Sequence, residues 1–266
     1  MNEIYNKLFV SEELETLWEC TSGYMDKNDC SWYHQNWLLL RSLGLVSNPM
    51  WHEQFYKYAI QKWIPPQAPN VLVLGTADFS MPYLCHQAGL ESIDICDICK
   101  TPLNICDWVS RTYSLNWNTF QANIYDGIDR VYDAIVDDAF LTRFDYNEKR
   151  TILKKIADAL KPHGIYITTI RQGWNDGHAL IPTKKQKDDF VNRARDAAIR
   201  LKFDVGDPQK AAREYVERMI SFPIQDMAYL KEMLSGIFEI AECNTAEVVG
   251  ECESSTYFRV ILTKKA

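Results

Sequence analysis

The segment Val71–Ser80 constrains the fold more than any other part of the chain. It reads Val-Leu-Val-Leu-Gly-Thr-Ala-Asp-Phe-Ser, so four consecutive apolar residues run into a glycine and a turn of small residues. An apolar run without polar alternation is typical of a parallel strand that is covered on both faces. Gly75 lets the chain turn tightly and lets a ligand approach the backbone. A helix is expected over 81–88, with Asp78 or Ser80 as its cap.

A second strand is expected at 92–96, and it ends at the carboxylate of Asp97. Open α/β sheets hold a nucleoside with a unit made of a strand, a glycine turn, a helix and a second strand. An acid stands at the end of the second strand, roughly twenty residues after the glycine. The acid then accepts hydrogen bonds from the ribose hydroxyls. The alternative role for Asp97 is to cap the helix that begins near Lys100.

The rest of the chain alternates in the same way, which predicts a doubly wound, seven-stranded and mostly parallel α/β sheet. A long helical segment separates the last two strands from the others, so these two are expected to form a hairpin that gives the sheet one antiparallel edge. The further strands are expected at 119–124, 132–136, 165–170, 238–249 and 257–263, and a helix at 146–160.

Two helical regions are expected to stand outside this alternation. Residues 1–64 are rich in aromatic side chains, with helix starts at Ser11, Ser31 and Asn48, and the proline-rich stretch 65–69 reads as a stiff linker. We therefore expect a helical cap or lid over 1–64 and an α/β domain over 65–266. Within that domain, residues 184–236 form a helical insertion.

Composition excludes several classes of protein. The chain has 266 residues, 47% of them hydrophobic, and a formal net charge of −7 without a basic block, so a nucleic-acid partner is not expected. The sequence lacks a secretion signal and an apolar run of the ~20 residues that a membrane span needs. Eight cysteines in such a chain are typical of reduced thiols, which predicts a cytoplasmic protein. The oligomeric state stays undecided.

Two sequence motifs resemble those of the class I S-adenosylmethionine-dependent methyltransferases. They are Tyr132–Phe140 (Tyr-Asp-Ala-Ile-Val-Asp-Asp-Ala-Phe) and Leu160–Gly164 (Leu-Lys-Pro-His-Gly), and the resemblance covers about residues 70–172. It implies S-adenosylmethionine as the cofactor and a transfer of its methyl group to an oxygen or nitrogen of a small molecule. The chain departs from the family pattern because its first loop keeps only one glycine and because Asn123 replaces an acid; an amide oxygen can make the same bond to the adenine amino group.

The resemblance also implies which residues hold the cofactor. They are expected in the loop after the first strand, at the end of the second, and after the third and fourth: Gly75, Thr76, Ala77, Asp78, Asp97, Ile98, Asn123, Ile124 and Asp137. Asp78 has two alternatives, contact with the amino-acid part of the cofactor or a cap of the next helix.

Four residues are candidates for the chemistry. Asp138 follows a strand at the end where open sheets bind ligands, and Arg171 ends the next strand, where it could hold a carboxylate on the acceptor. The alternative for Arg171 is an ion pair with one of the neighbouring strand-end acids. Tyr33 and His34 are candidates for a lid over the cofactor, with His34 as a base; the alternative is simple helix packing.

A metal is not expected from the sequence. The motif Cys96-x-x-Cys99 suggests a possible zinc site, with Cys85, His86 and Cys106 nearby in the sequence. A structural zinc site needs four ligands, usually from paired short motifs, and the sequence offers no second pair at a matching spacing. Buried, reduced cysteines are therefore the preferred interpretation.

Two rival functions stay open at this point. One is an enzyme that uses S-adenosylmethionine without methylating, by cyclisation or lyase chemistry that releases methylthioadenosine. The other is a non-catalytic ligand- or protein-binding module that keeps the fold. The sequence does not identify the acceptor or the atom that is methylated, nor does it decide whether a general base is needed.

Overall fold

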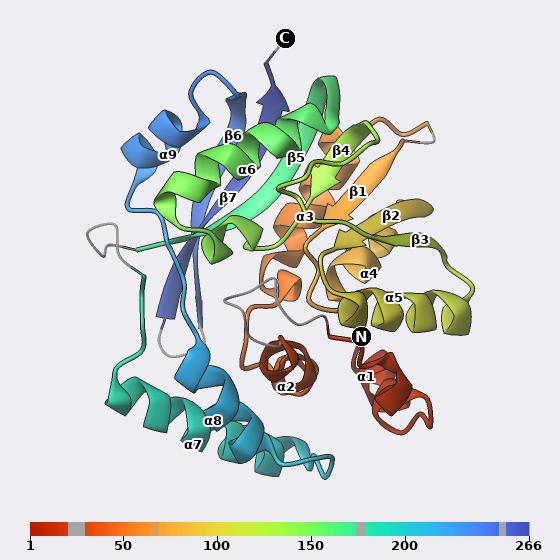
Figure 1. The fold of residues 1–266 in the computed structure, drawn as a ribbon, viewed down its shortest axis with the longest axis vertical. Coiled ribbons are helices and arrows are strands. Elements are labelled where there is room, and N and C mark those ends of the chain that lie inside the picture. Colours follow the sequence, from red (N-terminus) through yellow and green to blue (C-terminus); the bar gives the residue numbers. More distant parts are fainter. Residues whose placement is uncertain (21–29, 68, 174–178, 250–253, 266) are drawn as a thin grey trace.

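The strands form one seven-stranded sheet in the order β3-β2-β1-β4-β5-β7-β6 (Figure 1). The computed structural model describes residues 1–265 apart from 21–29, 68, 174–178 and 250–253. Strands β1 to β5 run parallel to one another, and β7 runs antiparallel between β5 and β6. The predicted doubly wound, mostly parallel sheet with an antiparallel hairpin at one edge is confirmed.

The strand bounds are β1 Val71–Leu74, β2 Ser92–Asp97, β3 Asn116–Gln121, β4 Tyr132–Val136, β5 Leu160–Gln172, β6 Phe238–Val249 and β7 Ser254–Lys264. The helices are α1 Asn2–Phe9, α2 Ser31–Ser42, α3 Glu53–Trp63, α4 Ser80–Gln87, α5 Lys100–Tyr113, α6 Tyr146–Asp158, α7 Lys184–Leu201, α8 Pro208–Arg218 and α9 Met227–Leu234. Short 3-10 turns lie at η1 Leu14–Leu17, η2 Pro49–His52 and η3 Phe140–Arg143.

Two predicted elements are displaced along the chain. The first helix was expected to open at Ser11, but α1 ends at Phe9, and the Ser11 hydroxyl instead accepts a hydrogen bond from the Glu13 amide within a local turn. Helix α1 forms earlier because Ile4, Tyr5 and Leu8 make a buried stripe at helical spacing.

The third strand was expected at 119–124 but occupies Asn116–Gln121. It is an edge strand whose alternating pattern is mostly polar, so the sequence marks its ends poorly. Pairing with β2 sets the register, with Ser92 opposite Asn116. As a consequence Asn123 and Ile124 follow the strand rather than belonging to it.

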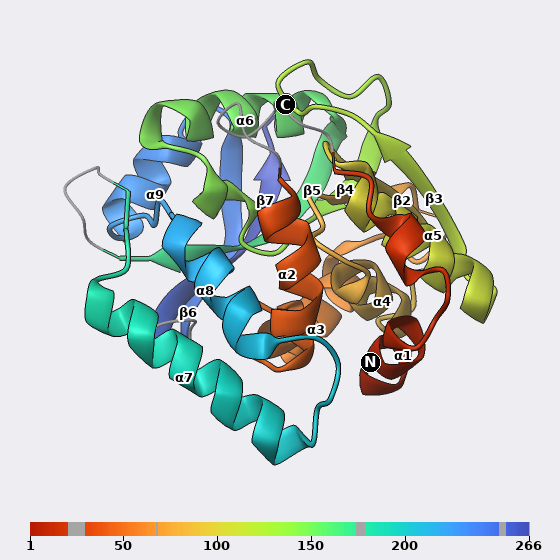
Figure 2. The same ribbon diagram turned by 60° about the horizontal axis from the view of Figure 1, so that its bottom comes forward.

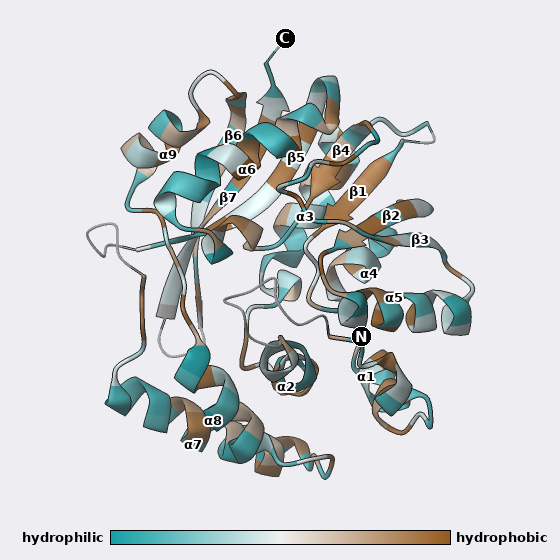
Figure 3. Cartoon of the chain, in the orientation of Figure 1, coloured by the Kyte–Doolittle hydropathy of each residue, from teal (hydrophilic) through white to brown (hydrophobic). Residues whose placement is uncertain are grey.

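Helices cover the sheet on both faces (Figure 1), and the central strands are largely apolar (Figure 3). One face of the sheet shares a core with α1, α3, α4 and α5. The other face packs against α6 and α9. The residues of β1 show why: Val71 and Val73 belong to the first core and Leu72 and Leu74 to the second, as the two-residue period of a strand requires.

A third core stands apart from the two faces of the sheet and joins α2, α7 and α8. Phe190 on α7 and Tyr215 on α8 pack there with Trp37 and Leu40 on α2. Figure 2 shows these three helices lying together across one end of the molecule. The segment 184–236 contains α7, α8 and α9, and α7 and α8 form a common layer with α2 of the N-terminal region. Within the described residues, every helix is too short or too polar to cross a bilayer.

Candidate functional site

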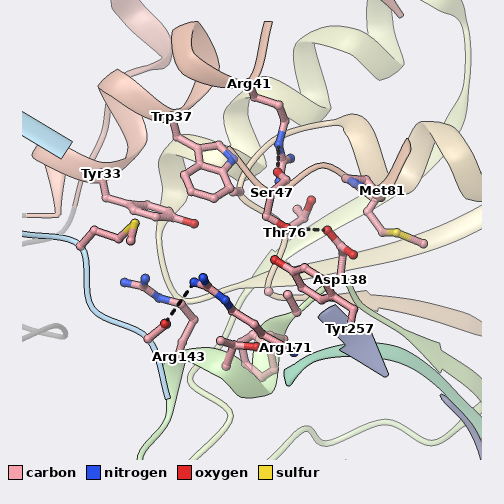
Figure 4. Close-up of a pocket in the computed structure, with 18 of the residues that line it drawn as sticks. Tyr33, Trp37, Arg41, Ser47, Thr76, Met81, Asp138, Arg143, Arg171 and Tyr257 are labelled. Carbon is pink, nitrogen blue, oxygen red and sulfur yellow. Dashed lines mark hydrogen bonds between the residues drawn. The ribbon is translucent and has the colours of Figure 1, made fainter. Parts of the chain in front are cut away.

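A cavity lies between the carboxyl ends of the central strands and the layer of α2 and α8 (Figure 4). Its volume is about 750 Å³ when the open mouth is included. Ligands of open α/β sheets bind at this end of the strands. Six of the predicted site residues line it, namely Tyr33, Gly75, Thr76, Ala77, Asp138 and Arg171.

The turn after β1 forms one wall of the cavity. Gly75 has φ +64°, in the region that favours glycine, and its amide donates to the Cys96 carbonyl of β2 at 2.8 Å. A Cβ placed on Gly75 would lie 2.2 Å from the ring of Phe140. Gly75 is therefore required both for the backbone conformation and for the close approach of that ring, which itself lines the cavity.

Asp78 lies behind this wall, fully buried, and its carboxylate is bound by protein groups. Arg41 of α2 makes an ion pair with it at 2.7 Å, and the Ser80 amide and the Tyr5 hydroxyl donate to it at 2.7 and 3.1 Å. The bond from Ser80 ties Asp78 to the first residue of α4, although the N-cap residue of this helix is Phe79. The ion pair fastens α2 to the loop that follows β1.

The two acids after β4 have different surroundings. Asp138 lines the cavity and accepts hydrogen bonds from Thr169, Tyr56 and Ser47 at 2.7, 3.1 and 3.2 Å. Asp137 is fully buried and accepts from the hydroxyls of Tyr166 and Thr168. Burial raises the pKa of Asp137 to about 7, against the opposing effect of these hydroxyls.

Two arginines reach the cavity without a carboxylate partner among the described residues. Arg171, at the end of β5, lies 3.4 Å from the Ser221 hydroxyl, so the alternative of an ion pair with Asp137 or Asp138 is not what the structure shows. Arg143 donates to the Ile220 carbonyl at 3.3 Å. Both side chains extend toward the space below Tyr33 (Figure 4).

Tyr33 and His34 are neighbours on α2 but point in different directions. The ring of Tyr33 lines the cavity and receives the guanidinium of Arg143 at 5.1 Å from its centroid. His34 is buried, does not line the cavity, and has its Nδ1 atom 3.7 Å from the Cys20 sulfur. Of the pair, only Tyr33 lines the cavity, whereas His34 faces a group of cysteines.

The predicted nucleoside residues lie beside the cavity rather than in its wall. Asp97 ends β2 and lies next to Gly75, because Leu74 pairs with Cys96 in the sheet. One oxygen of Asp97 accepts from the Cys99 amide at 2.8 Å in the turn that precedes α5, whose N-cap residue is Cys99. Burial raises the pKa of Asp97 to about 7. Ile98 follows it directly in the chain.

The chain after β3 returns to this point. The amide of Ala122 donates to the Asp97 carbonyl at 3.1 Å, which brings the following residues close to the end of β2. The side-chain oxygen of Asn123 accepts from the Tyr125 amide at 3.1 Å and so holds its own turn, and Ile124 is buried. The carboxyl ends of β1, β2 and β3 therefore meet around Gly75, Asp97 and Asn123.

Some residues of the site were not predicted. Arg41, Arg143 and Tyr215 line the cavity, and Arg41 and Tyr215 lie far in sequence from the strand ends, so the sequence gave no signal for these two. Arg143 lies within the turn after the two acids, Asp137 and Asp138, and its position past the end of β4 is the one clue that the sequence offered.

The comparisons with known proteins agree at the level of the fold. No family model matches the sequence, and no curated protein matches it significantly. Among solved structures, TehB from Haemophilus influenzae superposes with a TM-score of 0.53 at 16% identity, over 80% of this chain and 62% of TehB. The chain thus spans less than two thirds of the length of TehB.

Two further structures were solved with S-adenosylhomocysteine bound. The N-methyltransferase NodS from Bradyrhizobium japonicum has a TM-score of 0.51 at 13% identity, over 88% of this chain and 100% of NodS. Magnesium protoporphyrin IX methyltransferase from Synechocystis has a TM-score of 0.54 at 12% identity, over 88% of this chain and 97% of the enzyme. The chain therefore has the Rossmann-like fold of class I S-adenosylmethionine-dependent methyltransferases.

Proposed function

We propose that the protein binds S-adenosylmethionine at the carboxyl ends of β1, β2 and β3 and methylates an oxygen or nitrogen of a small anionic molecule. The observation that carries the proposal is the cavity beside this point. Its wall joins the Gly75 turn to Asp138 and to two arginines, Arg143 and Arg171, that have no carboxylate partner among the described residues. The fold and the ligands of NodS and the Synechocystis enzyme support the choice of cofactor.

The residues present fit a nucleoside cofactor. Asp97 supplies a carboxylate for ribose hydroxyls beside a glycine turn, and Ile98 and Ile124 supply apolar surface near the amide of Asn123. When bound, S-adenosylmethionine would supply an electrophilic methyl group. We assign its amino-acid end to the turn of Gly75, Thr76 and Ala77, whereas Asp78 and Asp137 support the site from behind.

The acceptor is assigned to the part of the cavity between Asp138 and the arginines. The guanidinium groups of two arginines that line one half-enclosed space repel each other. A carboxylate placed there would reduce this electrostatic repulsion and could accept hydrogen bonds from both groups. Asp138 can accept a hydrogen bond from a hydroxyl or amine on the same molecule and so orient its lone pair. Tyr33 and Trp37 of α2 cover the space and exclude water.

The cofactor part is tested by calorimetric titration with S-adenosylhomocysteine. The wild type should bind, and Asp97→Asn should bind 10- to 100-fold more weakly, because a hydrogen bond to a charged group contributes about 1.5–3 kcal/mol. Asp94→Asn is the matched control, since Asp94 lies on the same strand but bonds Asn118 and Tyr132 away from the site. Unchanged affinity in Asp97→Asn, or no binding by the folded wild type, contradicts the assignment.

The acceptor part is tested with small hydroxy and amino carboxylic acids and their amides as competing substrates. Release of S-adenosylhomocysteine should depend on the carboxylate, and Arg171→Gln should raise KM for the acid about 10- to 100-fold while leaving the affinity for S-adenosylhomocysteine unchanged. Methylthioadenosine as the product would instead support the non-methylating alternative. Equal use of acids and amides by the wild type would refute the role of the arginines.

A further inference from the structure

Three cysteines and a histidine from three separate segments meet near the start of α2. They are Cys20, Cys30, His34 and Cys99, and their sulfur and ring nitrogen atoms all lie within 4.8 Å of one another. Cys30 directly precedes α2 and His34 lies one turn into it, whereas Cys99 follows β2 and directly precedes α5. Cys30, His34 and Cys99 are buried, and Cys20 is half-buried.

The distances within the cluster match those between ligands of one tetrahedral ion. The sulfurs of Cys30 and Cys99 are 3.6 Å apart, and the sulfur of Cys20 is 3.7 Å from Nδ1 of His34. With zinc–sulfur bonds of 2.3 Å and zinc–nitrogen bonds near 2.0 Å, a tetrahedron places two sulfurs about 3.8 Å apart and a sulfur and a nitrogen about 3.5 Å apart. Little movement would bring the four atoms around a single centre.

The contacts within the cluster are poor as hydrogen bonds. The sulfurs of Cys30 and Cys99 contact each other, and the sulfur of Cys20 contacts the His34 ring. Hydrogen bonds between neutral thiols are weak, so they give little reason to gather these groups in one buried place.

We propose that Cys20, Cys30, His34 and Cys99 bind one zinc ion in a closed structural site. Three thiolates and an imidazole are a ligand set of structural zinc, and with four protein ligands no position is left open for substrate. The three thiols and the protonated imidazole lose their protons to solvent when the ion binds. The expectation of no metal considered Cys99 with Cys85, Cys96 and Cys106, whereas the structure combines Cys99 with Cys20 and Cys30.

The ion would join the lid to the cofactor edge of the sheet. Cys30 and His34 fix the start of α2, the helix that carries Tyr33 and Trp37 into the cavity. Cys99 lies two residues after Asp97 and donates its amide to that carboxylate at 2.8 Å. The Thr101 hydroxyl lies 3.2 Å from the Cys20 sulfur, so the segment before residue 21 is held at the same place. This role does not depend on the proposed methyl transfer.

The test is the metal content of the full-length protein, purified from zinc-supplemented culture and dialysed free of loose metal. Elemental mass spectrometry should give about one zinc per folded chain in the wild type and below about 0.2 in Cys20→Ser and Cys99→Ser. Cys243→Ser is the control, because Cys243 is half-buried like Cys20 but lies on β6 outside the cluster. It should keep the full zinc content.

A second measurement protects the test against variants that fail to fold. Wild-type protein stripped of metal under reducing conditions is titrated with cobalt, which should give intense visible bands and a thiolate charge-transfer band typical of tetrahedral sulfur coordination. Absence of zinc uptake by the folded wild type, iron in place of zinc, a disulfide among the cluster cysteines, or full zinc content in Cys99→Ser would each overturn the proposal.

Discussion

Replacing Gly75 by alanine should destabilise the protein through two separable effects. The first is the backbone, since φ is +64° at this position and an L-residue is strained there. The second is the ring of Phe140, whose nearest atom lies 2.2 Å from the place that the new methyl group would occupy. The ring has to move, and in moving it leaves its edge-on contact with Phe144, where the centroids are 4.9 Å apart.

The magnitudes follow from these two effects. A non-glycine residue in the left-handed region costs about 1–2 kcal/mol, and forcing extra atoms into a packed place costs typically 1–3 kcal/mol more. We expect Gly75→Ala to lower the free energy of unfolding by about 2–5 kcal/mol in total. Because Phe140 also lines the cavity, the displaced ring should weaken binding of S-adenosylhomocysteine as well.

The assay is urea unfolding followed by circular dichroism, with two matched variants. Gly44→Ala has a similar backbone, with φ +72°, but its methyl group would meet nothing within 4 Å. It should therefore show only the backbone effect, about 1–2 kcal/mol. Phe140→Ala removes the obstacle, so the double variant should recover about 1–3 kcal/mol of coupling. If Gly75→Ala is no less stable than Gly44→Ala, or if Phe140→Ala brings no recovery, the reasoning is refuted.

Three further predictions concern buried charges. Asp78→Asn should lower the free energy of unfolding in urea by about 3–5 kcal/mol, because it leaves the Arg41 guanidinium buried without its anion; a loss below 1 kcal/mol would contradict this. Burial lowers the pKa of Lys149 from 10.5 to about 7. Below about pH 10 the unfolded chain binds a proton at this lysine more tightly than the folded protein does, so the free energy of unfolding falls there. Lys149→Met should therefore raise Tm most near pH 7, and less as the pH approaches 10, whereas a gain independent of pH would point to packing alone. Burial raises the pKa of Asp137 from 3.8 to about 7. As the pH rises from 5 to 8, the wild type should therefore lose about 2–3 kcal/mol of unfolding free energy relative to Asp137→Asn, measured by urea titration of both proteins. The same pH dependence in the two proteins would contradict the shift.

The sheet could be predicted because its signals are local. An unbroken apolar run identifies β1, and the apolar run at the end of β4 identifies that strand; residues of both strands face a core on either side. The glycine after β1 and the acid after β2 follow from the same reasoning, and the register Leu74 to Cys96 does bring Gly75 and Asp97 side by side. The polar edge strand β3 was misplaced because one row of neighbours imposes only a weak pattern.

The direction of single side chains depended on tertiary packing. Tyr33 and His34 are adjacent, but successive residues on a helix point about 100° apart, so one faces the cavity and the other the cysteines. Asp137 and Asp138 differ in the same way, because one turns under the sheet to Tyr166 and the other into the cavity. The sequence predicted both residues of each pair as candidates for the site, but it could not tell which of the two faces the cavity.

The sequence by itself determined the order of strands and helices and the edge of the sheet where a nucleoside would lie, because periodicity and turn residues act within a few positions of one another. Only the tertiary structure decided which distant groups meet there. It brought Arg143 and Arg171 to one cavity, and it brought Cys20 and Cys30 to Cys99, across a separation of 69 residues for the pair Cys30 and Cys99. Such contacts depend on how α2 packs across the strand ends, and the spacing of the residues along the chain does not predict them.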